Sequence, residues 1–395
     1  MAVMSVTCRR IMSVVTALLL LCSTGVFTAP TPGTSGGSSS NPFASYCTRP
    51  SVRKEWRSLS LLERFQYLFA VNALFSVPNR SPDSFAASAK NRYDDLVATH
   101  INQTFSVHYV GHFLPFHRYM TWTFEQMLRK EVGYTGPFPY WDWHLDTGCG
   151  KNQQTFLQSP IWDPILGFGG NGPYIQATPA QAAGAVPGRS GGGCVQDGAF
   201  KNMKVNLGPG ATVNGPPRCL SRDFSFYFTN RYLQCNQTLA TLKAANFYLF
   251  DQIVEGGPSF ELSGVHGGGH YGIGGLFGIM GDLYVSPGDP SFWLHHANLD
   301  RVWWSWQQMN WPARKTDISG PSVIMDYNNF KVNPPVLQKS ANTTLSTPLD
   351  LQYADMVNGP ITVGNVMDIT QMGYTYDKLY TIADVTTCAN RNAAC

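Results

Sequence analysis

The sequence predicts a globular protein with a core built from helices and with long irregular loops between them. Apolar residues recur at helical spacing in several segments. Aromatic residues make up 13% of the 395-residue chain, so most of it must bury a core and cannot be disordered. The chain also holds 38 glycines and 26 prolines, which predicts extended loops around that core.

The first helix is predicted to begin at a capping box formed by Ser60 and Glu63. The apolar residues within 61–69 (Leu61, Leu62, Phe65, Leu68 and Phe69) predict that this helix is buried. A second helix is predicted over 117–130. Residues 163–218 are rich in glycine and proline and show no period, so we expect a long loop region there.

A helical pattern over 239–255 precedes a glycine-rich run at 264–281. Asp289 followed by Pro290 is typical of a helix start, with an N-cap and a proline at the first helical position. These two residues predict a helix over Ser291–Met309. Beyond it the chain mixes short β-like runs with turns, and no internal repeat is visible.

The net charge is close to neutral, at +3. A protein that binds DNA, RNA or anionic lipid through its charge carries a basic run or patch, and no basic run occurs in this chain. Nucleic-acid binding is therefore excluded as the expected function.

Residues 1–29 predict a secretory signal peptide, because two arginines precede a short apolar stretch and small residues follow it. The apolar stretch is too short to span a bilayer comfortably, which disfavours the alternative of a signal anchor. We therefore expect a secreted, extracellular protein that has no membrane segment after the signal is removed. Residues 30–45, rich in proline, glycine, serine and threonine, predict a flexible leader.

Export agrees with four Asn-X-Ser/Thr triplets, which are candidate N-glycosylation sites at Asn79, Asn102, Asn236 and Asn342. Seven cysteines follow the predicted signal, at positions 47, 149, 194, 219, 235, 388 and 395. In an oxidising compartment most of them should form disulfides. Their spacing does not give the pairing, and an odd number leaves at least one thiol free or paired between chains.

The nine histidines fall into two groups, and the second group has the spacing of metal ligands. His266 and His270 lie four residues apart and project from one face of a helical turn. Gly267 stands where a zinc protease carries its glutamate base, which excludes that class. His295 and His296 are adjacent on a predicted helix and point about 100° apart, so at most one of them can join the same metal.

Asp300 distinguishes between these two neighbours. It lies four residues after His296 on the same helix face, where its carboxylate could accept a hydrogen bond from the imidazole and fix its tautomer. This favours His296 as the third ligand and leaves His295 as a supporting or pocket residue.

The first group comprises His100, His108, His112 and His117. Pro115 lies between His108 and His117 and is predicted to interrupt any helix that joins them. His117 should therefore start a new helix. Glu125 lies near the same helix face as His117 and could support its imidazole.

Three imidazoles from each group would form two metal sites without carboxylate or thiolate ligands. Such sites suit copper or zinc, whereas magnesium, calcium and manganese favour oxygen ligands. Two adjacent sites of this kind with no activating base favour redox chemistry with O2 over hydrolysis.

Residues 108–125, HYVGHFLPFHRYMTWTFE, resemble the first copper-site signature of tyrosinases and related polyphenol oxidases. Residues 289–300, DPSFWLHHANLD, resemble the second signature. The segment PYWDW at 139–143 and the motif Tyr374-Thr375-Tyr376 are also similar to the family. The resemblance extends over roughly 50–380 and is greatest to short secreted fungal members.

This resemblance implies a mainly α fold, in which a central four-helix bundle holds a dicopper site among long loops and a few short strands. It implies a tyrosinase-like dicopper domain over residues 46–380. A short C-terminal tail at 381–395 would then follow, without the lid domain found in other members.

The resemblance also assigns the copper ligands. The first copper would be held by His100, His108 and His117, and the second by His266, His270 and His296. His112 falls at a variable position of the signature and is expected to be structural or pocket-lining, and His144 is expected to be a hydrogen-bonded core residue. Residues expected to support the ligands or line the pocket are Asp300, His295, Gly267, Tyr271, Leu283, Phe292 and Glu261.

Several positions depart from the family pattern. No cysteine lies between Cys47 and Cys149, so the thioether link that many members form to a ligand histidine is not expected at His108. Gly267 stands where strong monophenolases carry asparagine. Glu261 and Glu255 are the candidates for the glutamate that holds a water in the family, and Leu283 stands at its gate position.

The activity implied by the resemblance is that of a copper-dependent polyphenol oxidase. Such an enzyme oxidises o-diphenols to o-quinones while its co-substrate O2 is reduced to water. Small phenols would be its partners, and no partner protein is evident. The alternatives are a tyrosinase that hydroxylates monophenols, an oxidase of substituted phenols or o-aminophenols, and a haemocyanin-like O2 carrier. Ten tryptophans also suggest carbohydrate binding, but their helical spacing beside the histidines favours core packing.

Overall fold

The computed structural model describes residues 41–46, 50–148, 150–257, 260–324 and 340–393. The predicted signal peptide and the leader up to residue 40 lie outside these residues, as do Cys47, Cys149 and Cys395. Within the described part of the chain, no helix has the length and apolar character needed to cross a membrane.

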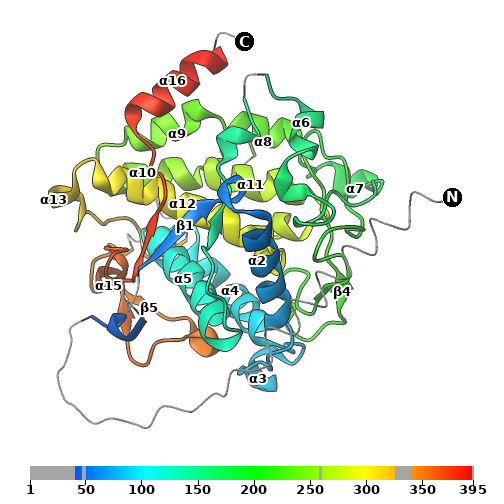
Figure 1. Ribbon diagram of the computed structural model, residues 1–395, viewed down its shortest axis with the longest axis horizontal. Coiled ribbons are helices and arrows are strands. Elements are labelled where there is room, and N and C mark those ends of the chain that lie inside the picture. Colours follow the sequence, from blue (N-terminus) through cyan, green and yellow to red (C-terminus); the bar gives the residue numbers. More distant parts are fainter. Residues whose placement is uncertain (1–40, 47–49, 149, 258–259, 325–339, 394–395) are drawn as a thin grey trace. The chain divides into compact units, whose positions relative to one another are not determined.

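The described chain is mainly helical, as expected, and four helices form its centre (Figure 1). They are α4 (Arg92–Val107), α5 (Phe113–Glu131), α11 (Val265–Gly274) and α12 (Ser291–Gln308). Helix α5 packs against α4 and α12, and α12 also packs against α11. This arrangement confirms the four-helix bundle.

Other helices surround this bundle. The longer ones are α2 (Leu61–Leu74), α8 (Phe226–Tyr232), α9 (Cys235–Leu242), α10 (Phe247–Glu255) and α16 (Ile382–Ala393). The shorter ones are α3 (Asp83–Ala86), α6 (Gln153–Leu157), α7 (Pro179–Ala182), α13 (Trp311–Arg314) and α15 (Val363–Val366).

The strands are few and short. A parallel three-stranded sheet has the order β2 (Pro139–Tyr140), β1 (Ser51–Glu55) and β7 (Tyr374–Tyr376), with Val52 opposite Thr375. Two antiparallel pairs join β3 (Lys204–Val205) to β4 (Arg218–Cys219) and β5 (Pro348–Leu349) to β6 (Ile361–Thr362). The sheet therefore brings the beginning of the domain next to its end.

Local capping explains where the main helices begin. The capping boxes Ser60–Glu63 and Asn91–Asp94 start α2 and α4. At the start of α12, Oδ1 of Asp289 accepts hydrogen bonds from both the backbone N–H and the hydroxyl of Ser291, each at 2.9 Å. The predicted helix starts at 61 and 291 are confirmed, but the N-cap of α12 is Pro290 and not Asp289 as predicted.

The prediction that α2 is buried on its leucines and phenylalanines is wrong. Leu61 and Phe69 are 65% and 60% exposed, and of the five apolar residues only Leu68 is buried. Helix α2 instead buries the opposite face, which carries Tyr67, Ala70, Val71 and Leu74. Both faces are apolar, so the spacing alone could not show which one turns inward.

Two other predicted boundaries differ from the structure. The helix expected over 117–130 begins earlier, at Phe113, because Pro115 lies in its first turn, where no intrahelical N–H donor is lost. The pattern over 239–255 is divided between α9 and α10, because Asn246 caps a new helix by accepting a hydrogen bond from the backbone of Leu249.

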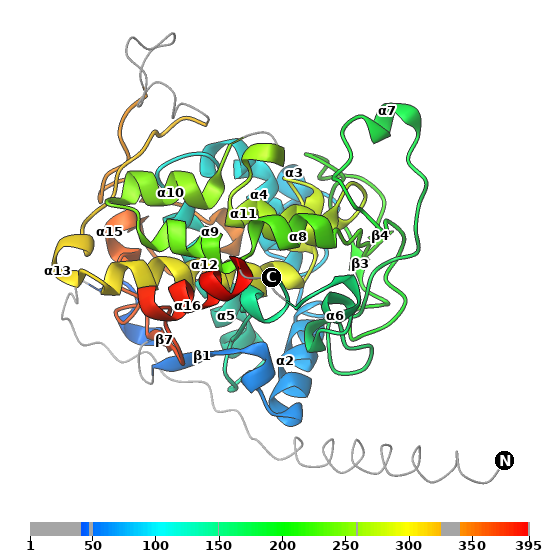
Figure 2. The same ribbon diagram turned by 90° about the horizontal axis from the view of Figure 1, so that it is seen from above.

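The region 163–218 is largely irregular, as expected, and it carries α7 and β3 (Figure 2). The disulfide Cys194–Cys219 closes its second half. Just beyond it, the buried guanidinium of Arg222 binds both carboxylate oxygens of Asp289, at 2.8 and 2.9 Å. This ion pair attaches the end of the loop region to the start of α12.

Both ends of the described chain pack onto the domain. Phe43 is fully buried against Trp122, with ring centroids 4.8 Å apart, so the folded domain begins before residue 46 and the last residues of the expected leader belong to it. At the other end, residues of the expected tail form α16, which packs on α9 (Figure 1). The disulfide Cys235–Cys388 joins these two helices.

Candidate metal centre

Two clusters of three histidines face each other among the central helices. In each cluster the potential ligand atoms lie within 4.8 Å of one another. The clusters are His100, His108 and His117, and His266, His270 and His296. Across the gap, the rings of His117 and His296 are 4.7 Å apart and those of His108 and His266 are 5.9 Å apart. The structure thus brings together all six histidines assigned as ligands.

The four central helices position these side chains. His100 lies on α4, and His108 is the residue at which α4 ends. His117 lies on α5, His266 and His270 lie one turn apart on α11, and His296 lies on α12.

Backbone carbonyls orient four of the six rings through their Nδ1 atoms. A carbonyl only accepts hydrogen bonds, so Nδ1 carries the proton and the lone pair resides on Nε2. The pairs are His100 with Tyr284 at 2.8 Å, His108 with Thr104 at 2.8 Å, His117 with Phe113 at 2.9 Å and His270 with Met280 at 3.0 Å.

Three of the six Nε2 atoms in the clusters lack a hydrogen-bond partner. Those of His100, His117 and His266 are buried without a hydrogen bond. The Nε2 atoms of His270 and His296 are 3.1 Å apart. Buried polar atoms without partners are costly, and converging lone pairs repel unless a cation lies between them. The donor set therefore fits a metal in each cluster, and its imidazoles suit copper.

Burial lowers the pKa of all six imidazoles, to about 4 for His108. For the other five, neighbouring imidazoles lower the pKa further. All six rings are therefore neutral at pH 7, which is the form that binds a metal.

Phe292 and His295 support the second cluster. Phe292 is fully buried and stacks on His296 with ring centroids 3.9 Å apart. Nε2 of His295 lies 3.0 Å from the backbone oxygen of His266 and donates a hydrogen bond to it, so this ring is turned away from the cluster. Gly269 makes room for it, because a Cβ there would overlap the His295 ring.

The expected hydrogen bond from His296 to Asp300 is not formed. Nδ1 of His296 has no hydrogen-bond partner. The carboxylate of Asp300 instead binds Arg53 at 3.1 Å, Arg118, and the hydroxyls of Tyr374 and Tyr376 at 2.7 and 2.6 Å. Two buried guanidinium groups and two hydroxyls outcompete a neutral imidazole for this anion.

The expected support of His117 by Glu125 is also wrong. Glu125 is buried and accepts hydrogen bonds from Arg53 at 2.9 Å and Arg129 at 2.7 Å. Arg53 thus binds both Glu125 and Asp300, which links α5 to α12 through strand β1.

The two candidate glutamates differ in burial. Glu261 is exposed, whereas Glu255 is only 1% exposed and accepts a hydrogen bond from the backbone N–H of Tyr109 at 2.6 Å. Tyr109 follows His108 and adopts a left-handed φ of 53°. Burial favours Glu255 over Glu261 as the glutamate that holds a water, and this role stays a prediction for both.

Gly267 leaves space beside His266. The nearest neighbours of a Cβ at this position would be Ser263, at 3.1 Å from its Oγ, and Tyr271, at 3.6 Å. Tyr271 is half-buried and packs against Phe228 and Phe260.

Leu283 is half-buried in the segment that separates Met280 from Tyr284. The carbonyls of these two residues hold His270 and His100, so this segment contacts both clusters. The placement is compatible with a gate at Leu283, which stays a prediction.

The remaining histidines lie outside both clusters. His112 is the N-cap of α5, with Nδ1 3.4 Å from the hydroxyl of Thr343. Nε2 of His144 lies 3.0 Å from the hydroxyl of Thr238. Of the candidate glycosylation sites, Asn102, Asn236 and Asn342 are exposed and Asn79 is half-buried. Glycan attachment, like the absence of a thioether at His108, stays a prediction.

We did not predict from the sequence which backbone carbonyls form hydrogen bonds with the histidine rings. His108 and His117 each use the carbonyl four residues earlier, at Thr104 and Phe113, and this repeated offset is a signal that the sequence contains. The carbonyls that hold His100 and His270 belong to another segment, so no local pattern could have found them.

Residues 90–309 match the family model described as the common central domain of tyrosinase. Tyrosinase P of Aspergillus terreus is 33% identical over 300 residues, covering 70% of this chain and 81% of the relative. N-acetyl-6-hydroxytryptophan oxidase ivoB of Emericella nidulans is 32% identical over 348 residues, covering 82% of this chain and 91% of the relative.

Among solved structures, a polyphenol oxidase variant from Thermothelomyces thermophila is similar, with a TM-score of 0.70 and 35% sequence identity. The match covers 83% of this chain and 89% of that one.

Proposed function

This chain belongs to the tyrosinase family of copper oxidoreductases, and we propose that it acts within that family as a catechol oxidase. Proteins of this type bind two copper ions and use O2. The observation that carries the finer proposal is Gly267, which gives the position after His266 no side chain with which to hold a water.

The six clustered histidines are the proposed ligands: His100, His108 and His117 for the first copper, and His266, His270 and His296 for the second. When bound, the copper ions supply the redox chemistry, by which two electrons pass from each diphenol toward O2. The protein keeps the imidazoles neutral, and backbone carbonyls fix the Nε2 lone pairs of four of them: His100, His108, His117 and His270. Phe292 excludes water from one side of His296.

Proton removal is the step that separates the two candidate activities. Hydroxylation of a monophenol requires the phenolate, and with a pKa near 10 only about one phenol in a thousand is ionised at pH 7. A water oriented by a glutamate and an asparagine would act as the general base. Glu255 offers a buried carboxylate, but Gly267 offers no amide, so half of that arrangement is missing.

A catechol would depend less on this base, because its oxidation to an o-quinone removes electrons and protons and inserts no oxygen atom. We therefore infer that o-diphenols are oxidised readily and that tyrosine-like monophenols react slowly and with a lag. A tyrosinase activity and an oxidation of o-aminophenols are the alternatives. The relative named for N-acetyl-6-hydroxytryptophan favours a hydroxylated indole as a second candidate substrate.

An extracellular location is part of the proposal. It is supported by the predicted signal at residues 1–29 and by the disulfides Cys194–Cys219 and Cys235–Cys388, which persist in oxidising compartments.

Copper analysis with O2 uptake on catechol tests the metal centre. We expect two copper ions per chain, and loss of one ion and nearly all oxidase activity in His117→Ala or His296→Ala. The matched controls His112→Ala and His144→Ala should retain both ions. Full copper and turnover in either ligand variant would show that the assignment is wrong, and bound copper without any turnover would favour an O2 carrier.

Initial rates on dopamine and tyramine test the specificity. The unaltered protein should oxidise dopamine much faster than it hydroxylates tyramine. Gly267→Asn should raise the ratio of tyramine to dopamine turnover, whereas Gly267→Ala, which adds bulk without an amide, should not. Equal rates on both substrates in the unaltered protein would favour the tyrosinase alternative, and faster turnover of a hydroxyindole would favour the second candidate.

A further inference from the structure

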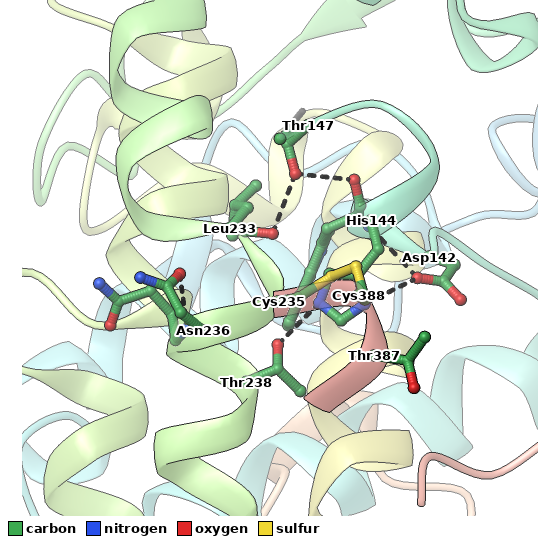
Figure 3. Close-up of a disulfide and its surroundings, with 12 residues drawn as sticks. Asp142, His144, Thr147, Leu233, Cys235, Asn236, Thr238, Thr387 and Cys388 are labelled. Carbon is green, nitrogen blue, oxygen red and sulfur yellow. Dashed lines mark hydrogen bonds and ion pairs between the residues drawn. A yellow bond between two sulfur atoms is a disulfide. The ribbon is translucent and has the colours of Figure 1, made fainter. Parts of the chain in front are cut away.

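His144, which lies outside the copper clusters, is next to a disulfide. One of its ring nitrogens and the two sulfur atoms of Cys235 and Cys388 all lie within 4.8 Å of one another. Figure 3 shows the imidazole between the disulfide and Asp142. The three residues come from separate elements: the turn after β2, the start of α9 and the last helix, α16.

These distances suit a four-coordinate metal. Zinc bonds to sulfur and nitrogen are about 2.3 and 2.0–2.1 Å long, so tetrahedral ligands lie about 3.5–3.8 Å apart. Two sulfur atoms released from a disulfide reach that separation by side-chain rotation. The three ligand atoms therefore need little movement of the helices that carry them.

The surroundings hold the imidazole and leave the group accessible. Oδ1 of Asp142 lies 3.8 Å from Nδ1 of His144, which is beyond hydrogen-bond distance, and the Asp142 carboxylate is bound to Arg301 at 3.1 Å and Tyr380 at 2.7 Å. A hydrogen bond of 3.0 Å between Nε2 of His144 and the hydroxyl of Thr238 holds the imidazole ring in place. His144 and Cys388 are only partly buried, so a reductant and a cation can reach the group.

We propose that reduction of the Cys235–Cys388 disulfide creates a third metal site, in which two thiolates and the His144 imidazole bind a thiophilic d10 cation such as Zn²⁺. An external thiol or phosphine reductant supplies two electrons, the S–S bond breaks and each sulfur takes up a proton. Binding of the cation then releases both protons. The metal would replace the covalent bond between α9 and α16, so the last helix stays attached in both redox states.

The second disulfide provides a matched control. Among the described residues, no histidine or carboxylate forms a comparable group with Cys194 and Cys219. Reduction of that disulfide releases two thiols without a ligand imidazole beside them.

Cobalt(II) is the probe, because thiolate ligands give it a charge-transfer absorption in the near ultraviolet that cobalt(II) bound to imidazoles alone does not give. In the full-length protein reduced with a phosphine, we expect one equivalent of cobalt to produce this absorption and Zn²⁺ to abolish it. The unreduced protein should not show it. The absorption should be lost in Cys235→Ser/Cys388→Ser and retained in Cys194→Ser/Cys219→Ser.

His144→Ala should weaken cobalt binding by more than the roughly 10- to 100-fold that loss of a residue supporting a ligand costs. Far-ultraviolet circular dichroism follows folding in each sample. An absorption that survives in Cys235→Ser/Cys388→Ser would assign it to other thiols and overturn the proposal. So would a reduced protein that unfolds equally with and without cobalt, or unchanged binding in His144→Ala.

Discussion

Replacing Asp300 by asparagine should remove the negative charge that holds two buried arginines beside the metal centre. Its carboxylate binds Arg53 and Arg118 and accepts hydrogen bonds from Tyr374 and Tyr376. Burial alone would raise the pKa of Asp300, but the guanidinium groups of Arg118 and Arg53 outweigh it and lower the pKa, so the carboxylate is charged at pH 7. Asparagine has nearly the same shape and no charge.

The expected cost follows from what each arginine retains. Arg53 keeps its ion pair with Glu125 at 2.9 Å. Arg118 keeps only neutral acceptors, such as the carbonyl of Val366 at 2.9 Å and Gln307 at 3.1 Å. Removing one partner of a buried ion pair costs about 3–5 kcal/mol, because the other charge stays buried.

This free energy converts into a shift of the melting temperature. At about 2.1 cal/mol/K per residue, a unit of about 355 residues has an unfolding entropy near 0.75 kcal/mol/K. The Tm of Asp300→Asn should therefore lie about 4–7 °C below that of the unaltered protein.

Calorimetry of the copper-loaded proteins, with circular dichroism as a second probe, measures this shift. Asp377→Asn is the matched control, since Asp377 is exposed and accepts hydrogen bonds only from neutral groups, the Tyr140 hydroxyl at 2.7 Å and the backbone N–H of Glu55 at 3.4 Å. It should change the Tm by about 1 °C or less. If Asp300→Asn melts within 1 °C of the unaltered protein, the reasoning about Arg118 is refuted.

Three further predictions concern the metal centre and its helices. Gly269→Ala should lower the free energy of unfolding by about 1–3 kcal/mol in urea titrations, because its Cβ would overlap the His295 ring. Gly267→Ala should cost less, because its Cβ would come no closer to a neighbour than 3.1 Å, at the Oγ of Ser263. Equal effects of the two substitutions would contradict the packing argument. The copper-free protein should lose stability as the pH falls below about 6.5. Burial lowers the folded-state pKa of His108 to about 4, so protonation favours the unfolded chain. Urea midpoints at pH 7 and pH 5 test this, and a stability that is constant over that interval would disprove it. Leu283→Ala should admit bulkier phenols, seen as a lower KM for substituted catechols than in the unaltered protein, and an unchanged substrate range would remove the gate.

Much of the site could be predicted from the sequence, because the relevant signals are local. His266 and His270 share a face of α11 because helical residues four apart always do. The starts of α2 and α12 followed from side chains that cap the nearest backbone N–H groups. The choice of His296 over His295 was correct in placing His296 in the cluster, although the reason given, a hydrogen bond to Asp300, was not.

The tertiary structure alone decided the contacts that join distant segments. The carboxylate of Asp300 turned to Arg53 and Arg118, and Cys235 paired with Cys388 over 153 residues. The apolar residues of α2 could have packed on either face, and the rest of the core selected one. Capping and helical periodicity act within a few residues, so one sequence window contains both partners. Ion pairs, disulfides and buried faces depend on which segments meet in space, and the free energy of the whole core determines that.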